Sequence, residues 1–152
     1  MIDRKRLEKA VRGKRVLIDS NIIIYLTEQT EPYYHLSHAL FSMIEDGISN
    51  AVISILSVSE VMRGPVKAGK IETATAICGY LRNFPNSLCQ DITVDVLAYV
   101  GSDKSVNWQS LRTVDSLIIA SGLCAHAELF ISNDRHFMKS LPQKMLLSFD
   151  PL

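Results

Sequence analysis

The stretch Val16-Leu17-Ile18-Asp19-Ser20-Asn21 places three consecutive aliphatic residues directly before an acidic one. A short apolar run without polar alternation is typical of a strand that is buried on both faces, as in a parallel sheet. An acid that follows such a strand lies at its carboxyl end, where open α/β sheets bind their ligands. This stretch therefore predicts a central strand and makes Asp19 a candidate site residue.

Three further acidic residues stand in comparable places along the chain. Glu60 and Asp134 follow aliphatic runs, and Asp115 opens an apolar helix; these segments are 51–55, 129–132 and 117–120. An alternating topology brings all four acids to one rim of the sheet. Four carboxylates without matched basic residues repel each other unless a cation neutralises them, and oxygen ligands suit Mg²⁺ or Mn²⁺. The pattern indicates metal-assisted phosphoryl chemistry.

Composition indicates one ordinary globular domain over residues 1–152, with 47% apolar and 21% charged residues. Sixteen basic and sixteen acidic residues give no net charge, which argues against a strongly basic nucleic-acid scaffold but allows a local basic patch. Cys78, Cys89 and Cys124 have no metal-binding spacing, so we expect reduced thiols. We expect no membrane span, no signal peptide and a cytoplasmic location.

Apolar periodicity and turn residues predict alternating strands and helices. Strands are expected over 16–18, 51–55, 87–91, 129–132 and 145–149. Helices are expected over 3–12, 21–27, 33–46, 57–63, 67–84, 93–100, 113–125 and 134–140. Gly64-Pro65 is expected to end the fourth helix. The predicted fold is a three-layer α/β sandwich, with a roughly five-stranded parallel sheet and helices on both faces.

Each acid also has a purely structural interpretation. Asp19 and Asp134 are suited to cap the helices that follow them. Ser57-Val58-Ser59-Glu60 has the form of a capping box, in which the glutamate bonds back to the Ser57 amide. Asp115 would lie in the first turn of a helix capped by Thr113, where the helix dipole favours an anion. The joint placement of the four acids on one rim, more than any single one, favours a metal site.

Four segments resemble the sequence motifs of the PIN-domain nucleases, in order and at similar separations. They are Leu17–Ile22, Ser57–Val61, Val114–Ala120 and Ile131–Phe137. The resemblance extends from about residue 15 to residue 150, and the most similar members in size are the VapC-type toxins. Two features differ from the plainest members: an extra helix within residues 1–14, and a polar stretch at 101–109 that holds the only Trp.

The resemblance implies a Mg²⁺- or Mn²⁺-dependent endoribonuclease with a PIN-like sheet of about five parallel strands. Our hypothesis is that Asp19, Glu60 and Asp115 bind one ion, partly through water. Asp134 completes this site or holds a second ion. The ion would lower the pKa of a bound water and offset charge in the transition state.

Neutral and basic residues beside the acids are candidates for supporting roles. Hydrogen-bonding residues that would fix the carboxylate rotamers are Ser20, Asn21, Ser132 and Asn133. Ordinary turn and cap chemistry accounts equally well for Ser20 and Asn133. Candidate RNA phosphate contacts are Arg112, Arg135 and Arg63, for which the alternative is a solvated surface charge.

The resemblance also implies partners: an RNA substrate, a cognate antitoxin protein and a second copy of the chain in a homodimer. The apolar run 22–26 and a groove between helices 33–46 and 67–84 are candidate antitoxin contacts, although core packing also explains the apolar run. A second class stays open, in which the chain is a PIN-like module that binds RNA or protein without cutting.

Overall fold

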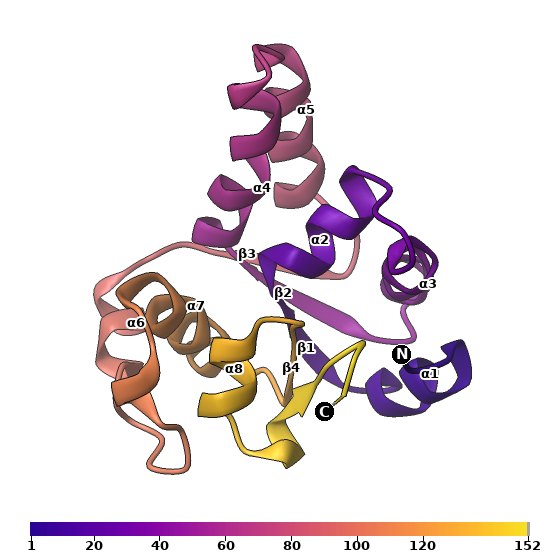
Figure 1. Ribbon diagram of the computed structural model, residues 1–152. Helices are drawn as coiled ribbons and strands as arrows, with labels where there is room; N and C mark the ends of the chain where they lie inside the picture. Colours follow the sequence, from indigo (N-terminus) through magenta and orange to yellow (C-terminus); the bar gives the residue numbers. More distant parts are fainter. Residues whose placement is uncertain (152) are drawn as a thin grey trace.

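Five parallel strands form one sheet in the order β3-β2-β1-β4-β5 in the computed structural model, which describes residues 1–151 (Figure 1). The strands are β1 Arg15–Ile18, β2 Asn50–Ser54, β3 Ser87–Gln90, β4 Leu129–Ile131 and β5 Leu146–Leu147. The predicted α/β fold with a five-stranded parallel sheet is therefore confirmed.

The helices are α1 Arg4–Val11, α2 Ser20–Thr27, α3 Tyr34–Glu45, α4 Ile55–Lys67, α5 Ile71–Arg82, α6 Val94–Tyr99, α7 Thr113–Cys124 and α8 Arg135–Ser140. Two 3₁₀ turns, η1 Trp108–Ser110 and η2 Gln143–Met145, complete the described elements. No helix within residues 1–151 has the length and apolar character that a membrane crossing requires.

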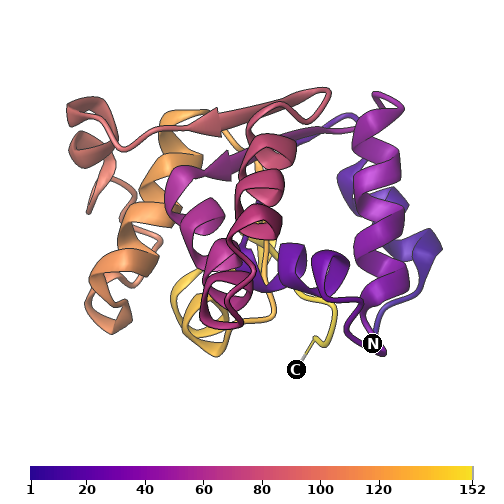
Figure 2. The same cartoon turned by 90° about the horizontal axis from the view of Figure 1, so that it is seen from above.

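Two apolar cores lie on opposite faces of the sheet. Val16 and Ile18 of β1 point into the larger core, which also receives residues of α1, α2 and α3. Leu17 points the other way, into a second core that receives residues of α7 and α8. Figure 2 shows α3 and α7 on opposite sides of the strands. Because β1 is buried on both faces, its aliphatic run has no polar alternation.

The central strands end together, and this alignment creates the rim that bears the acids. Ile18 of β1 pairs with Ile131 of β4, and Ile131 pairs with Leu147 of β5. The residues that follow β1 and β4 therefore emerge side by side. The Asp19 amide extends the pairing by donating to the Ile131 carbonyl at 3.0 Å.

The predicted end of α4 is wrong. Pro65 lies inside the helix, which continues to Lys67, and Gly69 makes the turn into α5 with φ of +74°. Pro65 has no amide proton to donate to the carbonyl of Val61, and α4 nevertheless stays helical for two more residues. As a result, α4 and α5 form a long hairpin that projects from the rest of the molecule (Figure 1).

The chain beyond β4 is less regular than predicted, because only Leu146 and Leu147 of the expected strand 145–149 pair with β4. Side-chain and N-terminal contacts hold the residues that follow. The Ile2 amide donates to the Phe149 carbonyl at 2.8 Å, and Asn133 Oδ1 accepts from the amides of Phe149 and Asp150. The helix predicted before residue 15 is α1, and it packs against α3.

Candidate active site

Asp19 lies at the centre of the rim, between the end of β1 and the start of α2. It is the N-cap of α2, and its Oδ1 accepts from the Ser20 amide at 2.8 Å. Its Oδ2 accepts from the Ser132 hydroxyl at 2.6 Å and from Asn21 Nδ2 at 3.5 Å. Only 3% of Asp19 is exposed, so the carboxyl group is both capping a helix and buried at the rim.

Ser132 joins the loop after β4 to the end of β1. Its hydroxyl donates to Asp19 and accepts from the Asp134 amide at 3.0 Å and from Asn21 Nδ2 at 3.4 Å. Ser132 is fully buried, because it follows a central strand. This one hydroxyl therefore sets the spacing between two of the predicted acids.

Glu60 reaches the rim from the middle of α4. The predicted capping box is wrong, because the helix begins at Ile55 and Ser54 caps it by accepting from the Leu56 amide. Ser57 thus lies inside the helix, and its buried Oγ has no hydrogen-bond partner within residues 1–151. Glu60 is half-buried, and it lines one groove between α2 and α4 together with Ser20.

Asp115 lies in the first turn of α7, with an exposed fraction of 3%. Arg112, not Thr113, is the N-cap residue, and its guanidinium holds Asp115 in a two-pronged ion pair. Arg112 Nε lies 2.8 Å from Oδ2, and Nη2 lies 3.1 Å from Oδ1. The same Nη2 lies 3.8 Å from Asp134 Oδ2, so Arg112 bridges two of the acids.

Asp134 caps α8 by accepting from the His136 amide at 2.7 Å. Its capping role was predicted as one of two interpretations, and the structure shows that it coexists with a place beside the other acids. Asp134 acts electrostatically on both Asp19 and Glu60.

The acids form one electrostatic unit. Burial, with smaller contributions from the charges of Glu60 and Asp134, raises the pKa of Asp19 to about 7, against the lowering effect of the hydrogen bonds from Ser132 and Ser20. Burial also raises the pKa of Glu60, with a smaller contribution from Asp115 that Arg112 opposes. Burial and the nearby carboxylates thus oppose ionisation of Asp19 and Glu60.

The supporting residues divide into two groups. Ser20, Asn21 and Ser132 each hydrogen-bond to a predicted acid. Asn133 bonds instead to Asn21, to Tyr25 and to the segment after β5, and none of its hydrogen bonds reaches an acid side chain. The contacts of Asn133 thus organise the rim indirectly.

Arg112 is the one of the three predicted arginines that bonds directly to the acids. Arg135 is exposed and adjacent to Asp134. Arg63 lines a groove of about 430 Å³ between α2 and α4, together with Ser20, Glu60 and Lys67. This groove opens at the rim and combines one acid of the site with two basic side chains.

The donor set is suited to a hard divalent cation, because every candidate ligand is a carboxylate. Asp19 is buried beside other acids, and the charges of Glu60 and Asp134 oppose its ionisation. The acids do not form a ready-made coordination shell: among residues 1–151, no group of three or more His, Cys, Asp or Glu is arranged to hold a metal ion. The chemistry of the residues fits a metal, while Arg112 already supplies charge to Asp115.

A buried aspartate lies at the carboxyl end of a central parallel strand, with acids from three later elements around it. Sequence comparison identifies the class of protein to which this arrangement belongs. The profile of the PIN domain matches residues 16–140. The chain belongs to the PIN domain family. Comparison with curated proteins gives no match.

Solved structures share the fold at low sequence identity. VapBC2 from Rickettsia felis, bound to a promoter DNA fragment, aligns with a TM-score of 0.62 and 18% identity, over 90% of this chain and 99% of that one. VapBC from Salmonella typhimurium, bound to DNA, gives 0.63 and 14%, over 89% and 98%. VapC20 from Mycobacterium tuberculosis, a toxin that cleaves the sarcin–ricin loop, gives 0.61 and 11%, over 82% and 93%. The fold is thus that of the VapC toxins.

Proposed function

We propose that this protein is a metal-dependent endoribonuclease and the toxin of a toxin–antitoxin pair. The observation that carries the proposal is the convergence of Asp19, Glu60, Asp115 and Asp134 from four separate elements, with Asp19 buried and its pKa raised. A structural role alone accounts for capping by Asp19 and Asp134 but not for the placement of Glu60 among them.

Asp19, Glu60 and Asp115 would hold Mg²⁺ or Mn²⁺, and Asp134 would complete the site or hold a second ion. When bound, the ion supplies charge neutralisation and activates water toward a phosphodiester. Ser132, Asn21 and Ser20 hold the Asp19 carboxylate in one rotamer, which keeps its oxygens directed at the rim.

Arg112 contributes positive charge to the proposed site, beside Asp115. Its guanidinium pairs with the buried Asp115, yet 62% of its side chain is exposed. One edge of the guanidinium is therefore accessible to a substrate phosphate while the other edge orients Asp115. Arginine suits this role because its planar fork binds carboxylates and phosphates alike.

RNA is the proposed substrate because one structure with the same fold is that of a toxin that cleaves the sarcin–ricin loop. The groove between α2 and α4 supports this choice, since Arg63 and Lys67 line it beside Glu60. These cations are placed to contact phosphates next to the cleaved bond.

An antitoxin partner is proposed because similar structures from Rickettsia felis and Klebsiella pneumoniae are toxin–antitoxin complexes. Apolar side chains on the α4–α5 hairpin support a protein contact: Val66, Ile71 and Tyr80 are each 46–58% exposed. A second hollow between these helices has a mostly apolar lining that includes Met62 and Val66. We also propose a homodimer and a cytoplasmic location, in which the free thiols would stay reduced.

The decisive experiment incubates purified protein with a mixed RNA pool in Mn²⁺, Mg²⁺ or EDTA, beside Asp19→Asn. Metal-dependent, discrete fragments that disappear in the variant support the nuclease. Asp46→Asn is the matched control, because Asp46 is exposed at the end of α3. This control variant should cut RNA as the parent protein does. Full activity in Asp19→Asn would refute the mechanism.

A non-catalytic binding module remains the second candidate, favoured by the ion pair that engages Asp115 and by the lack of a preformed metal shell. Thermal unfolding separates the two within the same experiment. A site that binds Mn²⁺ raises the melting temperature of the native protein by mass action, and Asp19→Asn should lose most of that rise. Absence of both cleavage and metal stabilisation would favour the module.

A further inference from the structure

Charge is strongly segregated along this electrically neutral chain. Residues 1–15 hold seven of the sixteen Lys and Arg side chains but only two of the sixteen acidic ones. This segment therefore carries a formal charge of +5, and the remainder of the chain carries −5. The segment includes the whole of α1.

The basic side chains of α1 face solvent, because the opposite face of the helix packs against the core. Leu7 and Val11 are fully buried, which fixes the helix against the sheet. The exposed cations of the helix without a salt bridge among residues 1–151 are Arg4, Lys5, Arg6 and Lys9. Within the described part of the chain, Arg12, the residue after α1, pairs with Glu8 alone. A rigid helix with several unpaired cations presents a binding surface for a polyanion.

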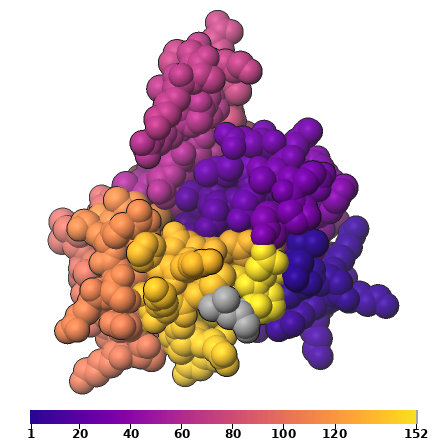
Figure 3. Space-filling model, in the orientation of Figure 1, coloured from indigo at the N-terminus to yellow at the C-terminus, as the bar shows by residue number. Residues whose placement is uncertain are grey.

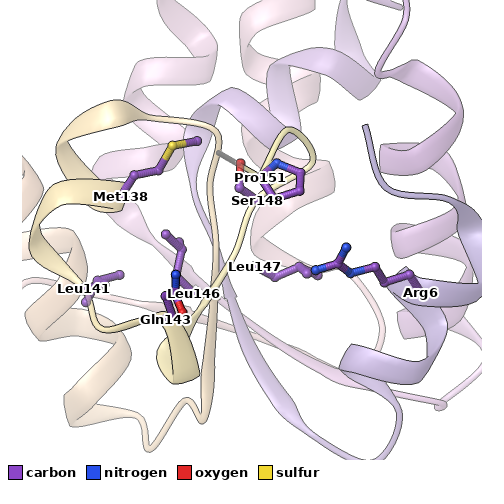
Figure 4. Close-up of a pocket in the computed structure, with 8 residues that line it drawn as sticks. All are labelled: Arg6, Met138, Leu141, Gln143, Leu146, Leu147, Ser148 and Pro151. Atoms are coloured by element: carbon purple, nitrogen blue, oxygen red, sulfur yellow. The ribbon is translucent and has the colours of Figure 1, made fainter.

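A pocket adjoins this basic surface. It has a volume of about 430 Å³, and Arg6 forms one wall opposite Met138 and Leu141 (Figure 4). Its lining combines aliphatic residues of β5 with the polar side chains of Gln143 and Ser148. An arginine above an apolar surface with a few hydrogen-bonding groups suits a nucleobase and its phosphate better than a purely acidic peptide.

The pocket lies close to the proposed active site. It borders β5, which is two strand positions from β1 and therefore about 10 Å across the sheet. Leu147 in its wall pairs with Ile131, the residue before Ser132 of the site. Figure 3 shows α8, the chain after β5 and α1 on one face of the molecule, without an intervening element.

We propose that the exposed cations of α1 and the adjoining pocket form a docking site for the backbone of the RNA substrate beside the cleaved bond. Phosphates contact Lys5, Arg6 and Lys9, and one nucleotide occupies the pocket. This inference rests on the proposed function, because the acid cluster itself repels an RNA strand and needs cations nearby to hold one.

The test compares two triple variants that lower the net charge equally. The docking variant carries Lys5→Gln, Arg6→Gln and Lys9→Gln, which preserve helix propensity and leave the buried face of α1 intact. The control variant carries Lys70→Gln, Arg82→Gln and Lys104→Gln, three exposed positions outside residues 1–15. Circular dichroism verifies that both remain folded. Binding of a fluorescein-labelled, mixed-sequence 20-nucleotide RNA is measured by anisotropy in EDTA across a salt series.

We expect the docking variant to bind about 10- to 50-fold more weakly at 0.15 M salt, with a log–log salt slope smaller by about 2. The control variant should stay within about twofold of the parent protein. Equal losses in both variants would overturn the proposal, because net charge alone would then explain them. A docking variant that keeps its RNA affinity but loses affinity for a polyglutamate 20-mer would also overturn it, in favour of an acidic protein partner.

Failure of the nuclease proposal gives a different result. If the parent protein cuts no RNA but only the docking variant loses RNA affinity, the docking site stands and the catalytic assignment falls. If the parent protein cuts RNA and the docking variant binds and cuts as well as the control, the docking site falls and the nuclease stands.

Discussion

Asp19 combines a structural and a chemical task in one carboxyl group. It caps α2, receives the Ser132 hydroxyl and lies almost fully buried among other acids. Burial raises its pKa to about 7, so without a metal the folded protein holds a proton there well above the normal range of an aspartate. The energetic cost of ionising this group is the quantity that a bound cation would offset.

Replacement of Asp19 by Asn should therefore change how stability depends on pH. Between about pH 4 and pH 7 the unfolded chain loses this proton while the folded state keeps it, so the free energy of unfolding falls as pH rises. Asn is neutral throughout this range. In EDTA we therefore expect the free energy of unfolding of Asp19→Asn to be about 2–4 kcal/mol higher than that of the parent protein at pH 8, and equal to it near pH 4.

Urea unfolding in EDTA at several pH values measures this difference. Asp46→Asn controls for the loss of one acidic residue, since Asp46 is exposed and outside the cluster. Parallel stability curves for Asp19→Asn and the parent protein would show that the group ionises normally.

At this scale the sequence predicted the acids better than their surroundings. Asp19 and Asp134 were predictable because an acid after an aliphatic run is a local pattern, and the structure confirms that both residues cap the helices that follow them. The place of Ser132 as a shared hydrogen-bond partner depends on a contact between β1 and β4 that no local pattern reveals. The pairing of Arg112 with Asp115 had a signal, their three-residue spacing at a helix start, but that spacing equally suggested a free phosphate contact.

The close approach of α7 to the sheet depends on Gly122. A Cβ at this position would lie 2.6 Å from Phe130 Cε1 and 2.8 Å from Leu17 Cδ1. We expect Gly122→Ala to lower the free energy of unfolding by about 1–3 kcal/mol, because overpacking outweighs the gain in helix propensity. Since Asp115 lies on the same helix, displacement of α7 should also weaken the site.

Gly79→Ala is the matched control for this prediction. Gly79 lies in α5, and a Cβ there would have no neighbour within 4 Å. The substitution should stabilise the protein by about 0.5–1 kcal/mol through helix propensity. Urea midpoints at unchanged m-values compare the two variants; stabilisation by both would mean that α7 has room to move.

Elements were predictable where burial produced a distinctive pattern. The strands β1, β2 and β4 came from aliphatic runs, because central strands of a parallel sheet are buried on both faces. The ends of α4 were missed at both sides. Its start is capped by Ser54 instead of Ser57, and its end tolerates Pro65, because tertiary packing determines which of several competing local signals is used.

At the scale of the molecule, α1 is an integral part of the fold. Leu7 is fully buried in the same core as β1 and α3, and the chain before it pairs with Phe149. We expect Leu7→Ala to lower the free energy of unfolding by about 2–5 kcal/mol and to shift the unfolding of the whole protein.

Trp108 provides the readout, because it is the only Trp and contacts the core on the other face of the sheet. In Leu7→Ala, the unfolding transitions followed by Trp108 fluorescence and by far-UV circular dichroism should shift to the same lower midpoint. Lys9→Ala, on the exposed face of α1, should leave both signals nearly unchanged. A Trp108 transition that stays in place while ellipticity is lost earlier would show that α1 unfolds separately.

The hydrogen bond between Asp19 and Ser132 joins residues 113 positions apart in the sequence. A fragment of the chain that is much shorter than this cannot contain both groups. Glu60 and Asp115 lie between them in the sequence, on other helices. Contacts of such long range form late and cooperatively during folding. A nascent or partly unfolded chain therefore has no assembled site, and if the protein is toxic, its harm is confined to fully folded molecules.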